Sequence, residues 1–109
     1  MVPIEAEKVQ KKLDELANQD IFLHLETTNG AYSARKFGAY IRNGLIHYSR
    51  GTIKGEDGAY RVGLKTEHGW IYGEWLTDWE TDDKGRLLLA GHDEEGRLAV
   101  AFQLSKEPF

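Results

Sequence analysis

The chain has no cysteine among its 109 residues, which excludes disulfide bonds, thiolate metal sites and a cysteine nucleophile. A chain without cysteine suits a reducing cytoplasm, and that is the location we expect. No stretch approaches the roughly 18 apolar residues that a membrane-spanning helix needs, so we expect no membrane partner. The N-terminal residues carry charges with no apolar run after them, unlike a secretory signal peptide.

Several catalytic signatures are also missing. The serines are Ser33, Ser49 and Ser105, and none lies in the Gly-x-Ser-x-Gly turn of a serine hydrolase. The chain has no phosphate-binding loop and no Gly-x-Gly-x-x-Gly segment that opens a helix. These absences make us lean away from an enzyme, and no cofactor is predicted.

The length fits a single domain over residues 1–109, and 40% hydrophobic with 29% charged residues is typical of a folded protein. The net charge of −4 argues against nucleic-acid binding. The charge is uneven: residues 31–65 carry seven basic and two acidic groups, whereas residues 66–109 carry four basic and ten acidic groups. We favour pairing of the basic middle with the acidic end across neighbouring strands. The alternative is a basic patch for an anionic ligand or an acidic partner.

The N-terminal residues show a helical pattern. Apolar side chains recur at spacings of three and four, which predicts an amphipathic helix within residues 1–18 that lies on a surface. They are Ala6, Val9, Leu13 and Leu16. Pro3 suits the first helical position, where its missing N–H costs nothing, and Asn18 is the expected stop.

From Asp20 onward the pattern alternates with a period of two, which predicts strands. Turn signals separate the strands at Asn29–Gly30, Asn43–Gly44, Asp57–Gly58, His68–Gly69, Lys84–Gly85 and Glu95–Gly96. The strands are expected near residues 37–42, 45–53, 59–65, 70–77, 86–92 and 97–104, after a first one that begins at Ile21. Asn43–Gly44 is the strongest hairpin signal because both residues tolerate positive φ. We expect a mainly β fold, an antiparallel meander over residues 20–104 that closes into a barrel or a sandwich.

Two details within the strands carry further expectations. Residues 87–90 are apolar on both faces, so this strand is expected to be central or covered by the helix. Gly63 and Gly73 interrupt strand patterns, and we interpret each as a bulge or as bare backbone beneath an aromatic ring. Close approach of a ligand is the alternative interpretation.

Four large aromatic residues fall within ten positions: Trp70, Tyr72, Trp75 and Trp79. Alternation places Trp70, Tyr72 and Glu74 on one face of a strand, with Ile71, Gly73 and Trp75 on the other. Rings of this size usually pack in a core, which is the interpretation we favour. The alternative is a stacking platform for a sugar or another flat ligand, with Glu74 or Asp78 as a polar clamp. The acidic flanks argue against stacking of nucleic-acid bases.

Histidine and carboxylate residues suggest a second kind of site. His24 and Glu26 share one face of a strand, and His92 and Asp93 end another, so the four could hold a transition metal. No fixed metal-ligand spacing supports this, and residues 93–96 also fit an ordinary solvated turn. Acid–base pairs could be Glu74 with Asp78, or Glu26 with Asp93.

Longer phrases of the chain resemble the YojF-like family, small bacterial proteins of unassigned function. They span residues 24–32, 60–65, 76–80 and 84–96. The resemblance implies a small β-barrel with an N-terminal helix. It also implies a gene neighbourhood that includes a sugar-amide deacetylase linked to making bacillithiol, a sugar-based thiol. It supplies no established catalytic residue.

We therefore expect a non-catalytic binding or accessory module for a small polar metabolite or a partner enzyme. The candidate ligand contacts are Trp70, Tyr72, Glu74, Arg61, His24 and Glu26. One alternative is a small metal-dependent enzyme that uses His24, Glu26, His92 and Asp93. The other is a structural homo-oligomer, a homodimer for example, whose aromatic residues form a subunit interface.

Overall fold

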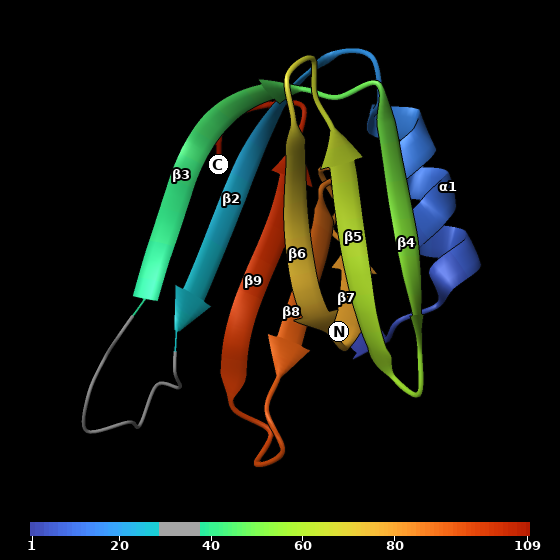
Figure 1. The fold of residues 1–109 in the computed structure, drawn as a ribbon, viewed down its shortest axis with the longest axis vertical. Helices are drawn as coiled ribbons and strands as arrows, with labels where there is room; N and C mark the ends of the chain where they lie inside the picture. Colours follow the sequence, from blue (N-terminus) through green and yellow to red (C-terminus); the bar gives the residue numbers. More distant parts are fainter. Residues whose placement is uncertain (29–37) are drawn as a thin grey trace.

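The computed structural model describes residues 1–28 and 38–109, which form nine strands in two antiparallel sheets and one helix (Figure 1). The large sheet has the order β1-β7-β8-β9-β2-β3. Its strands are β1 (Val2–Pro3), β2 (Asp20–Thr28), β3 (Gly38–His47), β7 (Asp78–Thr81), β8 (Leu87–His92) and β9 (Leu98–Ser105). The small sheet has the order β4-β5-β6, with β4 (Arg50–Glu56), β5 (Ala59–Lys65) and β6 (Trp70–Leu76).

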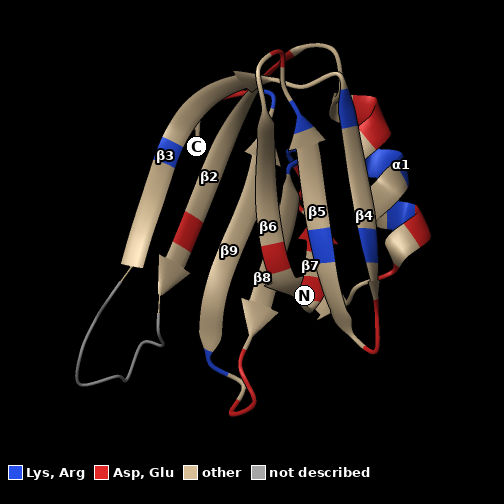
Figure 2. Ribbon diagram, in the orientation of Figure 1, with Lys and Arg blue, Asp and Glu red and all other residues tan. Residues whose placement is uncertain are grey.

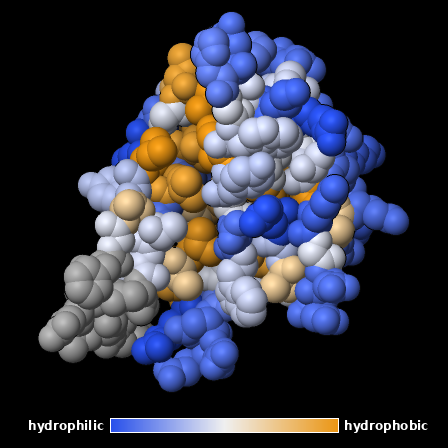
Figure 3. Space-filling view, viewed as in Figure 1, coloured by the Kyte–Doolittle hydropathy of each residue, from blue (hydrophilic) through white to orange (hydrophobic). Residues whose placement is uncertain are grey.

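Of the two predicted architectures the sandwich is correct, because the sheets stack without closing into a barrel (Figure 1). The small sheet packs β6 against β8 and β9 and leaves part of β2 and β3 uncovered. Ile41, which pairs with the inward-facing Leu25, is therefore 48% exposed. Figure 3 shows an apolar strip between β2–β3 and β6 on this side of the molecule.

Helix α1 (Ala6–Leu16) confirms the predicted stripe, since Val9, Leu13 and Leu16 are fully buried. The helix lies beside β4 (Figure 1), and the Gln10 side chain donates to the Gly51 carbonyl oxygen and accepts from the Ile53 amide. No helix of the described residues has the length and hydrophobicity that crossing a membrane requires.

The predicted position of Pro3 is wrong. Pro3 lies before the helix, in β1, where it is paired with Asp78 of β7. β1 is an edge strand, and a missing N–H is tolerated at a sheet edge as well as in a first helical turn. The expected stop is confirmed, because Asn18 follows the helix with φ 59°, in the left-handed region.

The core lies between the two sheets and beneath the helix. Leu23, Leu89 and Phe102 of the large sheet and Val62 and Leu64 of the small sheet are at most 1% exposed. The strand over residues 87–92 is central in its sheet, as expected.

Four of the six predicted turns are present, at Asp57–Gly58, His68–Gly69, Lys84–Gly85 and Glu95–Gly96. The turn predicted at Asn29–Gly30 lies outside the described residues. The hairpin predicted at Asn43–Gly44 is wrong, because both residues lie inside β3. There Arg42 and Asn43 together oppose one residue of β2, so the positive φ of Asn43 serves a β-bulge that bends the strand (Figure 1).

Candidate functional site

The outward face of the small sheet brings together four of the six predicted ligand contacts. Pairing between β4 and β5 sets Arg50 opposite Lys65, Thr52 opposite Gly63, and Lys54 opposite Arg61. Pairing between β5 and β6 continues the rows, with Lys65 opposite Trp70 and Gly63 opposite Tyr72. We call these residues, together with Glu74, the outer grid. The inward residues between them, such as Val62 and Leu64, are buried.

Two aromatic side chains of the grid face solvent, not the core. Trp70 is 45% and Tyr72 48% exposed, and their rings stack with centroids 5.7 Å apart and planes 7° from parallel. The core-packing interpretation is thus wrong for both residues. Alternation had put them correctly on one face, but it does not say which face of an antiparallel sheet is covered.

Trp75 was expected on the inward face with Ile71 and Gly73, and this too is wrong. Glu74 and Trp75 together oppose Arg61, which makes a β-bulge in β6. Trp75 has φ 56° and its side chain is 58% exposed. The fourth aromatic residue, Trp79, does pack against the core, so the favoured interpretation is correct for it.

Arg61 and Glu74 complete the stacked column. The Arg61 guanidinium carbon lies 5.1 Å from the Tyr72 ring centroid, and the guanidinium forms an ion pair with Glu74. Trp70, Tyr72 and Arg61 are therefore held against one another, with the carboxylate as an anchor. Glu74, and not Asp78, is the polar residue beside the rings.

Gly63 lies at the centre of the grid, beneath the rings. A Cβ atom at Gly63 would approach the Tyr72 ring to 2.9 Å and the Trp70 ring to 3.5 Å. Gly73 similarly lies beneath Phe102, on the inward side. The interpretation of both glycines as bare backbone under an aromatic ring is confirmed.

Around Gly63 the surface is hollowed by about 220 Å³. The hollow is lined by Arg50, Thr52, Lys54, Arg61, Gly63, Trp70 and Tyr72. Figure 2 shows the basic positions on β4 and β5 and the single acidic position on β6. Among the described basic residues of segment 31–65, only Arg61 forms an ion pair with the acidic end. The prediction that basic residues of segment 31–65 generally pair with acidic residues of segment 66–109 is therefore wrong. The alternative, a basic patch, is favoured.

The remaining two predicted contacts, His24 and Glu26, lie on the large sheet. Their side chains approach to 3.4 Å, and the His24 ring also packs against Phe109. His92 lies further along, since His24 is opposite Gln103 of β9 whereas His92 is opposite Leu98. The four residues of the metal hypothesis thus fall into two places, His24 with Glu26 and His92 with its neighbour Asp93.

Asp93 lies in the turn before β9, where its carboxylate accepts from Arg97 at 2.9 Å. Within residues 1–28 and 38–109, no group of three or more possible metal ligands converges. Of the predicted acid–base pair Glu74 and Asp78, the first lies in β6 of the small sheet and the second in β7 of the large one.

His92 instead forms a polar cluster that the sequence did not indicate. Its Nδ1 lies 3.0 Å from Asp78 Oδ1, and the Thr77 hydroxyl donates to the same oxygen at 2.6 Å. The Thr77 hydrogen bond and, after it, His92 lower the pKa of Asp78, outweighing partial burial. The cluster forms where the chain crosses from β6 of one sheet to β7 of the other, so no single strand pattern contains it.

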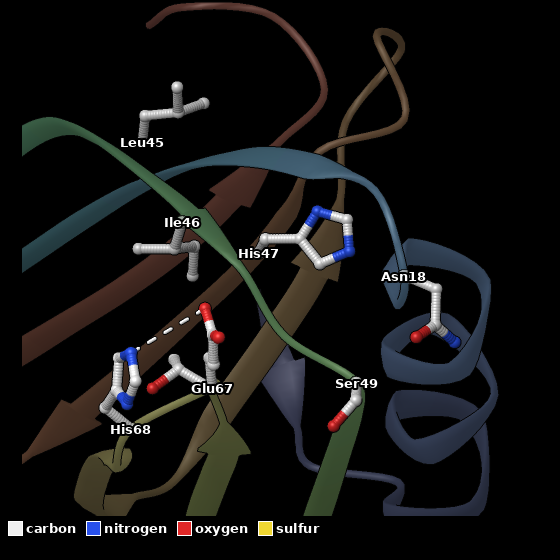
Figure 4. Close-up of a pocket in the computed structure, with 8 residues that line it drawn as sticks. Asn18, Leu45, Ile46, His47, Ser49, Glu67 and His68 are labelled. Atoms are coloured by element: carbon white, nitrogen blue, oxygen red, sulfur yellow. Dashed lines mark ion pairs between the residues drawn. The ribbon is translucent and has the colours of Figure 1, made fainter.

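A second hollow, of about 480 Å³, opens at the end of the molecule where β3 passes into β4 (Figure 4). It is lined by Asn18, Leu45, Ile46, His47, Ser49, Thr66, Glu67 and His68. His68 and Glu67 form an ion pair at 3.7 Å, but their side chains are 90% and 87% exposed. Such a rim is poorly ordered in advance, whereas the rings of the outer grid are fixed by stacking. The outer grid is therefore the better candidate site.

Fold and site together define a two-sheet β-sandwich with exposed aromatic and basic side chains on one outer face. The chain belongs to the family described as protein of unknown function (DUF1806), whose model matches residues 3–109. It is 48% identical to the uncharacterized protein YojF of Bacillus subtilis (strain 168), over 100% of this chain and 98% of that protein. The crystal structure of Bacillus subtilis YojF is similar with a TM-score of 0.86 and 45% identity, covering 98% of this chain and 94% of that one. The resemblance to the YojF-like family is confirmed.

Proposed function

We propose that the protein is a non-catalytic binding module that holds a ring of a small polar metabolite on the outer grid. The observation that carries the proposal is the column of Trp70, Tyr72 and Arg61, stacked and half-exposed beside a hollow. Exposed rings of this size are costly to leave in water, and a fitting ligand face would cover them.

Two features of the site support binding over catalysis. The stacked rings are already ordered, so a ligand loses little affinity to ordering them. The charged side chains of the grid are lysine, arginine and Glu74, whose carboxylate is engaged with Arg61. This set offers hydrogen bonds to hydroxyl and amide groups but no free general base.

Titration calorimetry with neutral methyl glycosides and amino-sugar glycosides tests the proposal. Trp70→Ala should weaken binding about tenfold or more, because it removes the ring face at the end of the column, and Tyr72→Ala should do the same by removing the ring against which Trp70 stacks. Trp75→Ala is the matched control, since that ring is even more exposed, at 58%, but does not line the hollow. Equal binding by all three variants, or no binding of any glycoside to the unchanged chain, would contradict the proposal.

The resemblance adds a partner and a setting to this proposal. A sugar-amide deacetylase is proposed as the partner enzyme, with bacillithiol synthesis as the process and the cytoplasm as the location. Pull-down of the deacetylase by the tagged chain, compared with the Trp70→Ala chain, tests the partner. Cell fractionation tests the location.

A further inference from the structure

We infer that the hollow of the outer grid takes an anionic group, a carboxylate or a phosphate, carried by the ring that stacks on Trp70 at the end of the column. This inference rests on the proposed function and names the class of its ligand. It follows from charge and strand register, which are independent of the stacking.

The outer grid is strongly basic within an acidic chain. Within the grid, Arg50, Lys54, Arg61 and Lys65 stand against the carboxylate of Glu74, and Glu56 comes next on the same face of β4, which leaves a local charge of +2 where the whole chain has −4. Arg61 is already paired with Glu74. The other three cations form no ion pair with any described residue, so their charge is available to a ligand.

The strand register sets like charges directly opposite each other twice. Arg50 faces Lys65, and Lys54 faces Arg61, across the β4–β5 ladder. Directly opposed like charges destabilise a sheet, because opposed side chains are roughly 5 Å apart at Cβ. An anion bound between the two pairs would neutralise both repulsions at once.

Thr52 lies between these two pairs and lines the hollow, where an anion has room beside the rings that cover Gly63. Thr52 and Gly63 are opposite each other. On the same face of the sheet, the Arg50–Lys65 pair is next to them in one direction and the Lys54–Arg61 pair in the other. Gly63 has no side chain, and the Thr52 hydroxyl can donate a hydrogen bond. Long basic side chains from rows about 7 Å apart on either side can reach one group above this row. The stacked rings border the same space.

Three monosaccharides that share one ring separate the possibilities in titration calorimetry: methyl glucoside, glucuronate and glucose 6-phosphate. At about 20 mM NaCl we expect one or both anionic sugars to bind about tenfold or more tighter than methyl glucoside. The preference should shrink at about 200 mM NaCl, because salt screens exposed charges. Comparison of glucuronate with glucose 6-phosphate tells a carboxylate site from a phosphate site.

The variants Arg50→Gln and Lys54→Gln should remove most of this preference, so that each variant binds the anionic sugars little tighter than it binds methyl glucoside. Lys11→Gln, on the exposed face of α1, is the control for net charge. Lys106→Gln tests another basic hollow, lined by Lys84, Arg86, Ser105, Lys106 and Glu107. A preference that Lys106→Gln removes, or one that no grid variant changes, would overturn the inference.

The two proposals fail in different ways. If all three sugars bind equally and Trp70→Ala weakens each of them, the proposed function holds and the anion inference is wrong. If no sugar binds but inorganic phosphate binds and Arg50→Gln weakens it, the anion site holds and the ring-binding function is wrong. Circular dichroism and the thermal midpoint of each variant establish that it is folded before binding is measured.

Discussion

The Tyr48 hydroxyl donates a 2.7 Å hydrogen bond to the Leu13 carbonyl oxygen. Tyr48 lies between β3 and β4, so the bond joins this connection to the last turn of α1. Carbonyl groups in the last turn have no partner within the helix, so this bond supplies one. Burial raises the pKa of Tyr48 above its usual range, so the hydroxyl keeps its proton and remains a donor.

Tyr48→Phe should therefore destabilise the protein by about 1–2 kcal/mol, because it leaves a buried carbonyl unpaired without removing the ring. Urea unfolding followed by circular dichroism measures the change. Tyr40→Phe is the control, since Tyr40 is 72% exposed, and it should change the free energy of unfolding by less than about 0.5 kcal/mol. Equal effects of the two substitutions would contradict the role given to Tyr48.

The two strand glycines should respond differently to alanine. At Gly73 the added Cβ would lie 2.4 Å from the buried Phe102 ring, so Gly73→Ala should destabilise by about 1–3 kcal/mol. At Gly63 it meets the half-exposed Tyr72, which can move outward. Gly63→Ala should thus unfold close to the original midpoint but bind sugars more weakly. Urea midpoints and calorimetry on both variants check this, and the reverse order of stability would be contrary evidence.

The polar cluster at Asp78 should make stability depend on pH in a defined direction. Because the pKa of Asp78 is lowered in the folded chain, its ionisation stabilises the fold above the pKa of the unfolded chain, and this contribution is lost as pH falls through the folded value. Asp78→Asn should reduce the unfolding free energy near neutral pH, and the difference should shrink as pH falls below the ordinary aspartate value of 3.8. Urea midpoints at several pH values measure it.

Thr77→Val tests the main cause of that shift. Loss of the hydroxyl should let the pKa of Asp78 rise toward its ordinary value, so acid unfolding should begin at higher pH than in the unchanged chain. If the difference in unfolding free energy between Asp78→Asn and the unchanged chain stays constant down to about pH 2, then Asp78 ionisation is not linked to folding.

Removing one member of an opposed like-charge pair should stabilise the ligand-free protein. Lys65→Gln, opposite Arg50, should raise the unfolding free energy by a few tenths of a kcal/mol, up to about 1 kcal/mol. The gain should fall with added salt. Thermal unfolding at low and high salt checks this, with Lys11→Gln as the control, and a loss of stability at low salt would contradict the repulsion.

Elemental analysis tests the metal hypothesis on protein purified without a chelating tag. Because His24 and Glu26 lie apart from His92 and Asp93, and no three possible ligands converge among the described residues, we expect less than about a tenth of an equivalent of any transition metal, and no stabilisation on adding one. A stoichiometric metal that His24→Ala or His92→Ala removes would restore the metal-dependent alternative.

The sequence predicted what depends on local periodicity. Spacing alone predicts the helix stripe of Val9, Leu13 and Leu16. It also predicts the strands at 59–65 and 70–76, because neighbours along the chain determine which face each side chain takes. The strands β1 and β7 were missed: β1 has only two residues, and only Thr77 separates β7 from β6. A change of sheet at one residue leaves no turn signal.

The site was harder to predict because it depends on pairing between strands. Residues 70, 72 and 74 were assigned to one face correctly, but their exposure depends on which face of the small sheet packs on Phe102. The contribution of Arg50 and Lys54 follows from the β4–β5 register, which a single sequence does not specify. The bulges at Asn43 and Trp75 likewise depend on the partner strand.

The β-bulges have a consequence for how molecules of this protein meet one another. A sandwich with open sheets has four outermost strands, and each could extend by pairing with a strand from another chain. Here β1 is only two residues long, Gln10 of the helix occupies backbone groups of β4, and β3 and β6 each carry a bulge that interrupts regular pairing. The described fold therefore discourages growth into fibres or sheets of many copies, and leaves its stacked rings accessible to small molecules.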